Sequence, residues 1–266
     1  MTYLNDVWLG VIEGITEFLP ISSTGHLIVA EHWLGQRSDT YNIVIQAGAI
    51  LAVTVIYWRT LVELIGNWRE PENRDYLIKL IIAFLVTSVL GLIVKKMGFE
   101  LPTAVTPIAW ALVIGGFWMI AAEWGASKLP DSSKVTLKVA IAVGIAQIIA
   151  GIFPGTSRSG STIFLAMLLG TSNRAAATQF AFLVGIPTMY AASGYELLSQ
   201  LRHGAGTGVE SWTSLGIAFV VSTITAFIAV KWLLGYIQTH RFTLFAIYRI
   251  IFGGILLVLA YSGTIG

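Results

Sequence analysis

Two glutamates near the start of the chain, Glu13 and Glu17, lie four residues apart in an otherwise apolar segment. On a helix this spacing places both carboxylates on one face, about one turn apart. Such a pair suits a shared hard cation, Mg²⁺ or Ca²⁺, with a phosphate completing the coordination shell. Without a cation, mutual repulsion would leave one carboxylate as a candidate general base. The alternative is a pair of structural glutamates satisfied by a neighbouring helix.

A polar turn follows the two glutamates, and a turn of the same kind recurs in the second half of the chain. Each turn combines hydroxyl side chains with glycine and stands before an apolar stretch that is expected to be helical. Free N–H groups and the positive dipole end of such a helix can bind phosphate. The plainer alternative is that these residues only cap two helices. The candidate phosphate-binding residues are Ser22, Thr24, Gly25, Gly155, Thr156, Ser157, Ser159 and Thr162.

Charged and titratable side chains accompany these turns. Arg158 stands alone as a basic residue in its apolar stretch, and a guanidinium can hold a phosphate through two parallel hydrogen bonds. Its alternative role is a structural ion pair with Glu13 or Glu17. His26 is placed for nucleophilic or acid–base chemistry, although a lone histidine is as often a hydrogen-bonded structural residue. Arg249 lies in the last apolar segment, where an ion pair or the membrane interface would satisfy its charge.

The two turns belong to a longer internal repeat with an offset of 134 residues. One copy supplies two carboxylates and a histidine, and the other supplies an arginine, so we expect one composite site built from both halves. The repeat divides a single expected integral membrane domain, residues 1–266, into halves 1–125 and 126–266. Gln46 and Gln179 recur in both halves as candidate supports for the turns. The offset matches Gly10 with Gly144, Glu13 with Gln147, Pro20 with Pro154 and Ser23 with Ser157.

The composition predicts an all-α polytopic membrane protein. The chain of 266 residues is 56% hydrophobic and only 11% charged, whereas a soluble domain has about 25% charged residues. The absence of cysteine excludes disulfides, and a net charge of +2 is too small to indicate nucleic-acid binding. Six segments reach the roughly 20 apolar residues that a bilayer crossing requires. They are residues 41–58, 76–97, 104–124, 177–198, 213–236 and 242–262.

Two further units, residues 4–34 and 136–170, are interrupted by the polar turns. The arm that follows each turn has only about 10 residues, which suits a re-entrant helix rather than a crossing. Each half would then hold one re-entrant hairpin and three crossings. Because three is odd, the second half should be inverted relative to the first, an arrangement that places broken helices face to face.

The basic residues in the connections predict the orientation of the chain. Four lie on the side shared by both termini, and ten lie on the other side, which the positive-inside rule assigns to the cytoplasm. Both termini are therefore expected outside the cytoplasm. The four are Arg37, Lys95, Lys96 and Arg202; the ten are Arg59, Arg69, Arg74, Lys79, Lys128, Lys134, Lys138, Arg174, Lys231 and Arg241.

The two motifs resemble the signatures of a known family. The stretch EGITEFLPISSTGH, from Glu13 to His26, resembles the first signature of the bacterial undecaprenyl-diphosphate phosphatases of the bacitracin-resistance type. The stretch PGTSRSGST, from Pro154 to Thr162, resembles their second signature. The resemblance extends over essentially the whole chain, including its length and the order of its apolar segments.

The resemblance implies a multi-pass enzyme of the bacterial inner membrane that removes one phosphate from undecaprenyl diphosphate. The product is the lipid carrier for peptidoglycan, and bacitracin sequesters the substrate. The resemblance also implies dependence on a divalent cation and a site open to the periplasm. Glu13 and Glu17 would hold the cation or act as base, and Arg158 would hold the phosphate. Ser23, His26 or an activated water would attack the terminal phosphorus.

Other classes of function remain in competition at the level of sequence. A secondary transporter or flippase for a polyprenyl phosphate or another anion would also use an inverted repeat. It would not need carboxylates, arginine, serines and histidine at one site. A scaffolding membrane protein would not need polar residues in the turns at all. The expected partners are a polyprenyl diphosphate and membrane lipid, without nucleic acid, and a homo-oligomer is compatible with the sequence.

Overall fold

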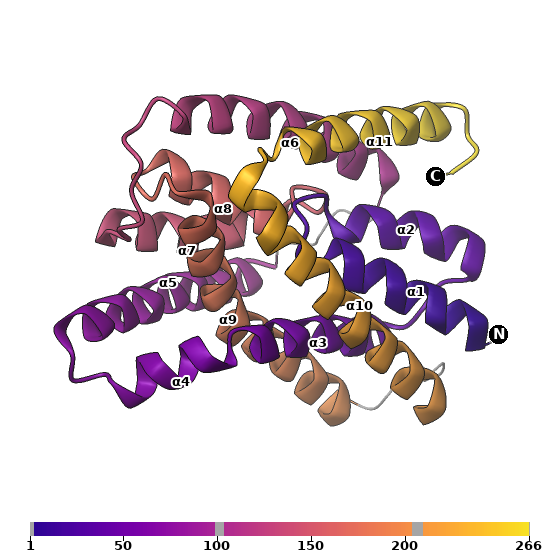
Figure 1. The fold of residues 1–266 in the computed structure, drawn as a ribbon. Coiled ribbons are helices and arrows are strands. Elements are labelled where there is room, and N and C mark those ends of the chain that lie inside the picture. Colours follow the sequence, from indigo (N-terminus) through magenta and orange to yellow (C-terminus); the bar gives the residue numbers. More distant parts are fainter. Residues whose placement is uncertain (1–2, 99–103, 204–209, 266) are drawn as a thin grey trace.

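The structure, a computed structural model, describes residues 3–98, 104–203 and 210–265, and these form eleven helices without a strand among them (Figure 1). The side chains of Glu196 and of residues 200–203, which include the predicted loop cation Arg202, lie outside the described part.

Six of the described helices are long and apolar enough to cross a membrane, so the chain is a multi-pass membrane protein. All six predicted segments are found, with ends shifted by a few residues. The second begins earlier than predicted, at Pro71, because proline is well suited to the first turn of a helix. The six are α3 (Asp39–Ile56), α5 (Pro71–Lys96), α6 (Val105–Ala126), α9 (Arg174–His203), α10 (Trp212–Thr239) and α11 (Thr243–Tyr261).

Four shorter helices form the two interrupted units. Helix α1 (Tyr3–Thr16) leads through the first polar turn into α2 (Ser23–Leu34), and α7 (Leu137–Ile152) leads through the second into α8 (Arg158–Leu168). The arms after the turns have 12 and 11 residues, too few to cross a bilayer. Their re-entrant placement and the inversion of the second half remain predictions.

Helix α4 (Trp58–Gly66) occupies a stretch that its charges had marked only as a polar connection. Trp58, Val62 and Ile65 form an exposed apolar stripe along it, with Arg59 nearby in the sequence. Helices with this division of faces lie in the membrane interface. The spacing of the apolar residues, rather than the number of charges, was the informative signal here.

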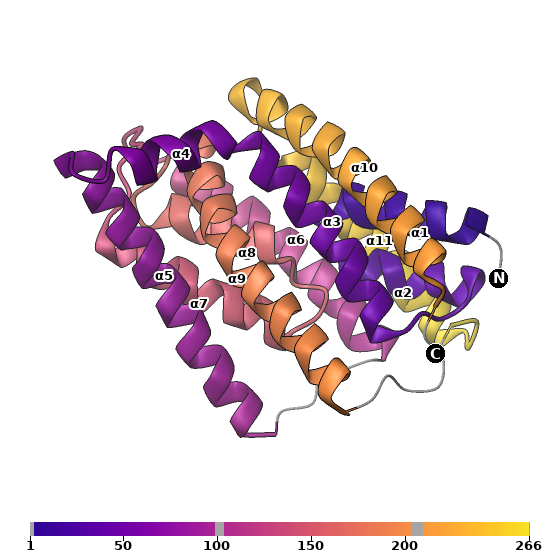
Figure 2. The same cartoon turned by 90° about the horizontal axis from the view of Figure 1, so that it is seen from below.

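The first helix of each half packs against the other half. Helix α1 packs along α10, and α7 packs along α5 (Figures 1 and 2). Glycines permit both contacts: a Cβ on Gly10 would lie 2.8 Å from the carbonyl oxygen of Ala218, and one on Gly144 would lie 2.7 Å from that of Ala83.

Threonines reinforce the same two helix pairs. Thr225 Oγ1 of α10 donates to the carbonyl of Gly10 at 3.3 Å, and Thr87 Oγ1 of α5 donates to that of Gly144 at 3.0 Å. The related positions Gly10 and Gly144 therefore have related surroundings. The two interrupted units are held in the centre by helices that come from the opposite half of the sequence.

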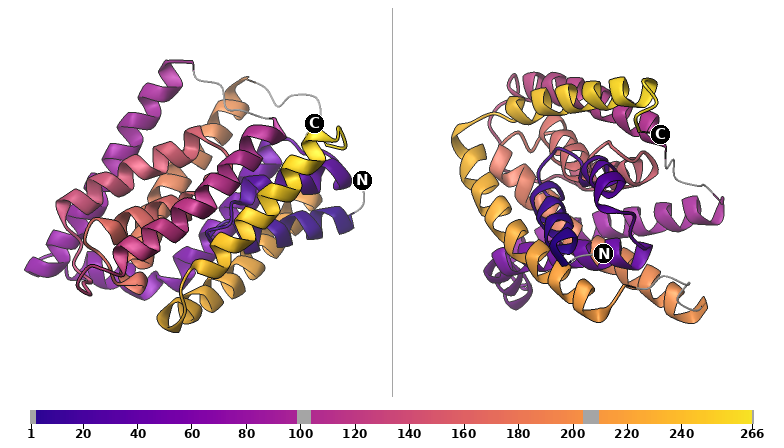
Figure 3. Two further views of the ribbon diagram at one scale, coloured as in Figure 1. Left: turned by 90° about the horizontal axis from the view of Figure 1, so that it is seen from above. Right: turned by 90° about the vertical axis from the view of Figure 1, so that its right-hand side faces the viewer.

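The described ends of the chain lie at one end of the molecule, and α4 lies at the opposite end (Figures 2 and 3). Helix α9 passes through the interior and packs against α3, α5 and α8. Buried Phe180, Leu183 and Val184 on α9 belong to the largest hydrophobic cluster. In the polar turns, Ser22, Gly155 and Ser157 are buried. Irregular backbone is tolerated at membrane depth where protein or a water-filled cavity surrounds it.

Candidate active site

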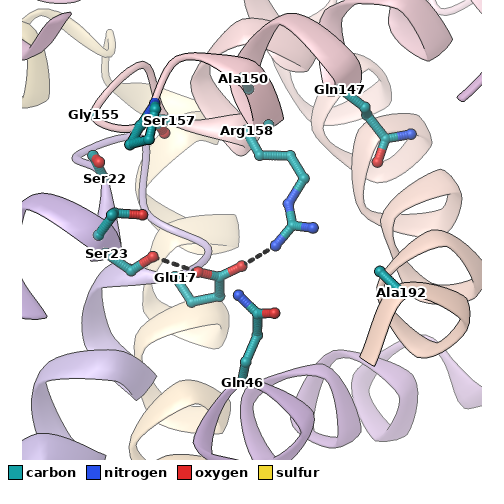
Figure 4. A pocket seen from close by; sticks show the side chains of 13 residues that line it. Glu17, Ser22, Ser23, Gln46, Gln147, Ala150, Gly155, Ser157, Arg158 and Ala192 are labelled. Carbon is teal, nitrogen blue, oxygen red and sulfur yellow. Dashed lines mark hydrogen bonds and ion pairs between the residues drawn. The ribbon is translucent and has the colours of Figure 1, made fainter. Parts of the chain in front are cut away.

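Glu17 joins the two halves of the chain at one point (Figure 4). Ser23, the first residue of α2, donates a hydrogen bond from its Oγ to Glu17 Oε2 at 2.5 Å. Arg158, the first residue of α8, donates from Nη2 to the other oxygen, Oε1. One buried carboxylate therefore holds a hydroxyl from the first turn and a guanidinium from the second, 141 residues further along the chain.

A cavity of about 420 Å³ opens beside this trio. Its walls come from both turns and from α3, α7 and α9, so both halves are needed to build it. Glu17, Ser23 and Arg158 all line it, as expected for a composite site. The other lining residues are Ser22, Thr24, Gln46, Gln147, Ala150, Gly151, Pro154, Gly155, Ser157 and Ala192.

The backbone of the two turns corrects the register of the repeat. Ser22 with φ 72° precedes α2, and Ser157 with φ 69° precedes α8, so these two serines are equivalent. Their offset is 135 residues, one more than the offset of 134 predicted. The extra residue lies at Gly155, whose φ of 94° suits glycine. Ser23 therefore corresponds to Arg158, not to Ser157, and Glu17 binds the two equivalent residues.

A left-handed serine is uncommon, and such a conformation costs about 1–3 kcal/mol unless its surroundings hold it. Direct contacts between the turns provide part of that support. Ser159 Oγ donates to the carbonyl of Leu19 at 3.2 Å, which ties the second turn to the first. Ser157 Oγ accepts from the N–H of Gly160 at 3.2 Å and caps α8.

Glu13 lies behind the trio and is only 1% exposed. Its Oε2 has no hydrogen-bond partner in the part of the chain that the structure describes. It faces a second cavity of about 440 Å³ between α2 and α3. Ser23, Thr24 and Gln46 line both cavities, so these three residues separate the cavity beside Glu17 from the one beside Glu13.

Both ring nitrogens of His26 are engaged outside the cavity that holds Glu17. Nδ1 lies 2.7 Å from the carbonyl oxygen of Ser22, which can only accept, so Nδ1 carries the proton and donates. Nε2 lies 2.7 Å from the hydroxyl of Tyr248. The ring also stacks on Phe252 at a centroid distance of 4.4 Å. In this arrangement His26 has no free lone pair for attack on phosphorus.

Comparison with known proteins decides the family. Residues 6–255 match the family described as Bacitracin resistance protein BacA. The chain belongs to the BacA family. A relative from Rhizobium etli (strain CIAT 652) is 71% identical over 265 residues, which cover 100% of both chains. One from Xanthomonas euvesicatoria pv. vesicatoria (strain 85-10) is 61% identical over 250 residues, 94% of both chains. Both relatives bear the name Undecaprenyl-diphosphatase.

The remaining predicted residues of this BacA-family site divide into two groups. Ser22, Thr24, Gly155 and Ser157 line the main cavity with the trio. The others lie outside its lining. Gly25 packs against Leu112, and Thr156 Oγ1 donates to the carbonyl of Phe153 at 2.6 Å. Ser159 and Thr162 line a crevice of about 20 Å³ behind Glu17. Gln179 lines neither cavity and does not line this crevice.

Gln147 is a further residue of the BacA-family site that was not among the predicted supporting residues. It lines the main cavity, accepts from Thr188 Oγ1 at 2.9 Å and donates to Thr87 Oγ1 at 3.1 Å. The repeat already paired Gln147 with Glu13, and that pairing was the signal that could have identified it.

The carboxylates fit a divalent cation only if other ligands join them. The described residues contain no group of three or more Asp, Glu, His or Cys side chains placed to hold a metal. Glu13 nonetheless keeps a buried oxygen without a partner, and Glu17 lies one helical turn further on. Mg²⁺ commonly uses one or two carboxylates and completes its shell with water and substrate phosphate. The residues present therefore fit a cation that arrives with a phosphorylated substrate.

The sequence left open whether Arg249 forms an ion pair or lies at the membrane interface. It is 1% exposed and pairs with no carboxylate among the described residues; instead, it donates to backbone carbonyls. Nη2 donates to Gly155 at 2.9 Å, and Nη1 donates to Thr156 at 3.0 Å. Arg249 therefore holds the backbone of the second polar turn through these two carbonyls.

Proposed function

We propose that this protein hydrolyses undecaprenyl diphosphate to undecaprenyl phosphate and inorganic phosphate. The observation that carries the proposal is the pair of bonds on Glu17, which place a serine hydroxyl and an arginine on one carboxylate beside a cavity. The name of the relatives at 61–71% identity over nearly the whole chain supports the same activity. The comparisons favour this enzyme over the transporter suggested by the repeat.

Ser23 is the proposed nucleophile, and Glu17 is its base. Because Ser23 Oγ already donates to Glu17, the carboxylate can take the proton as the oxygen attacks the terminal phosphorus. The bond from that phosphorus to the bridging oxygen breaks, and undecaprenyl phosphate leaves. Glu17 passes the serine proton to the departing undecaprenyl phosphate or to solvent and is again a carboxylate. Water then attacks the phosphoserine, Glu17 takes a proton from the water, and it returns this proton to Ser23 Oγ as the bond between that oxygen and phosphorus breaks, which releases inorganic phosphate.

Arg158 supplies the positive charge that the phosphoryl group needs. Its guanidinium is paired with Glu17, and 30% of its side chain is exposed. A diphosphate entering the cavity would draw Arg158 from Glu17, which frees the carboxylate to act as base. The starts of α2 and α8 add backbone N–H groups on either side. Charge stabilisation of this kind carries most of the catalysis in phosphoryl transfer.

A divalent cation, Mg²⁺ or Ca²⁺, is proposed to be held by Glu13 and Glu17 together with the substrate phosphates. It would supply further neutralisation of phosphate charge. The partner-free oxygen of Glu13 is the feature that supports this assignment.

The proposed location is the bacterial inner membrane, with both termini and the opening of the site on the periplasmic side. The excess of basic residues in the opposite connections supports this orientation. Cysteines introduced separately at the exposed Ser262 and Ser133 would test it, because the chain has no native cysteine. In intact spheroplasts a membrane-impermeant thiol reagent should label only the first. Labelling of only the second would reverse the orientation.

Release of inorganic phosphate by the purified protein in detergent is the direct test of the activity. We expect release from undecaprenyl diphosphate with Mg²⁺ or Ca²⁺ present, and none from undecaprenyl phosphate. A mock purification from cells that lack the protein controls for a contaminating phosphatase. Equal release by the mock preparation and the parent protein, or no release by the parent, would contradict the proposal, whereas equal release by Ser23→Ala would exclude only the serine as nucleophile.

A further inference from the structure

Two consecutive residues of α11, Tyr248 and Arg249, act on different polar turns: Arg249 contacts the second turn directly, and Tyr248 reaches the first through His26 of α2. Arg249 donates to the carbonyls of Gly155 and Thr156, directly before the left-handed Ser157. Tyr248 bonds the ring of His26, and His26 donates to the carbonyl of the left-handed Ser22. Each uncommon serine conformation is therefore held through a carbonyl by a chain of contacts that begins on α11.

The packing around Arg249 is built for this contact. A Cβ on Gly115 of α6 would collide with the guanidinium, so the glycine leaves the space that Arg249 fills. Nη2 also donates to the carbonyl of Ala111 at 3.2 Å. The buried guanidinium thus binds three backbone carbonyls and no carboxylate among the described residues. Its contacts therefore hold the backbone in place and do not neutralise an acidic side chain.

The packing around His26 is of the same kind. Its ring stacks on Phe252 and lies parallel to Tyr248, with centroid distances of 4.4 and 5.6 Å. The hydroxyl of Tyr248 is placed to donate to Nε2, because Nδ1 holds the proton. This leaves the histidine as a rigid link between α11 and Ser22.

We infer that Tyr248 and Arg249 are positioning residues, with Tyr248 acting through His26 to aim Ser23 and Arg249 acting through the Gly155–Thr156 backbone to aim Arg158. Neither touches the trio around Glu17. The inference rests on the proposed function, because hydrolysis is its readout.

The two braces should affect different kinetic constants. Ser23 forms the bond to phosphorus, and a small misplacement of a nucleophile slows the chemical step more than it weakens binding. Arg158 and the start of α8 hold the phosphate, so their misplacement should weaken binding first. If Tyr248 and Arg249 only stabilised the fold, their substitution would change kcat and KM in the same proportion in both variants.

The test measures kcat and KM for undecaprenyl diphosphate with the purified variants. We expect Tyr248→Phe to lower kcat about tenfold with KM within about twofold, and Arg249→Met to raise KM about tenfold with a smaller loss of kcat. Arg249→Lys should recover part of the lost affinity, because an ammonium can reach one or two of the carbonyls. Gly115→Ala, which displaces the guanidinium without removing it, should also raise KM.

The matched controls are Tyr261→Phe, on the same helix, and Arg241→Met, both at exposed positions away from the turns. They should leave kcat and KM unchanged. Parallel changes in both constants for Tyr248→Phe and Arg249→Met, or no change in either, would overturn the inference. If Arg249→Met does not fold, an unchanged KM in Gly115→Ala and Arg249→Lys would overturn it. An inactive parent protein would instead refute the proposed function itself.

Discussion

Replacing Glu17 by glutamine tests whether this carboxylate acts through Ser23. The substitution keeps the size of the side chain and an oxygen that can accept from the serine, but it removes the negative charge and the base. Glu17 is buried but Arg158 is partly exposed and can be solvated, so the loss of their ion pair should cost about 1–3 kcal/mol of folding free energy. The variant should therefore fold and bind lipid, which leaves catalysis as the property that changes.

The expected loss of activity follows from the hydrogen bond between Ser23 and Glu17. A positioned base contributes about 10²–10⁴ in rate, so kcat of Glu17→Gln should fall by that factor. Ser23→Ala should lose a similar amount. Because groups that act as one unit are strongly non-additive, the double variant should be about as slow as the slower single variant.

The assay is phosphate release at saturating undecaprenyl diphosphate, with thermal melting to confirm that each variant is folded. Losses that multiply in the double variant would show that Glu17 does not work through Ser23. Ser23→Ala activity within about tenfold of the parent protein would remove the serine as nucleophile and favour direct attack by water.

Three further outcomes are expected. Arg158→Lys should lower kcat/KM about ten- to hundredfold, because an ammonium cannot make the paired bonds of a guanidinium; unchanged kinetics would contradict its role. Chelation by EDTA should abolish phosphate release. The Glu13→Gln variant should need more Mg²⁺ than the parent protein to reach its half-maximal rate. Identical Mg²⁺ titrations of the variant and the parent would show that Glu13 is not a ligand. Gly144→Ala should destabilise the protein by about 1–3 kcal/mol, because the new Cβ would meet the Ala83 carbonyl, whereas Gly235→Ala has open space; equal melting temperatures would refute this packing argument.

The sequence was sufficient for the parts of the fold that depend on long apolar runs. The six long helices and the two broken units follow from the length and the interruption of those runs. The meeting of Glu17, Ser23 and Arg158 followed from an asymmetric repeat. Helix α4 was missed because its charges concealed an apolar stripe that only a helical period reveals.

Details that depend on backbone conformation and distant packing could not be predicted. The one-residue shift between the turns arises at Gly155, a left-handed residue that makes the second turn one residue longer. The two motifs still look alike in sequence, so the shift could not be predicted from them. The contact of His26 Nε2 with Tyr248, 222 residues away, could not be predicted from the residues around the histidine. Gln147 was not among the predicted supporting residues, because local sequence does not report which helix face meets the cavity.

The packing of α1 against α10, a helix of the other half, also sets an order of events during synthesis. Helix α1 emerges first, but α10, against which Gly10 and Gly14 pack, is made about 200 residues later. At a translation rate of about 5–20 residues per second, the first helix waits roughly 10–40 seconds for its partner. Glu13 therefore enters the membrane long before its final surroundings exist. A nascent chain arrested before α10 would contain Glu17, Ser23 and Arg158 but would lack the helix against which α1 packs, so the site is expected to be completed only late in synthesis.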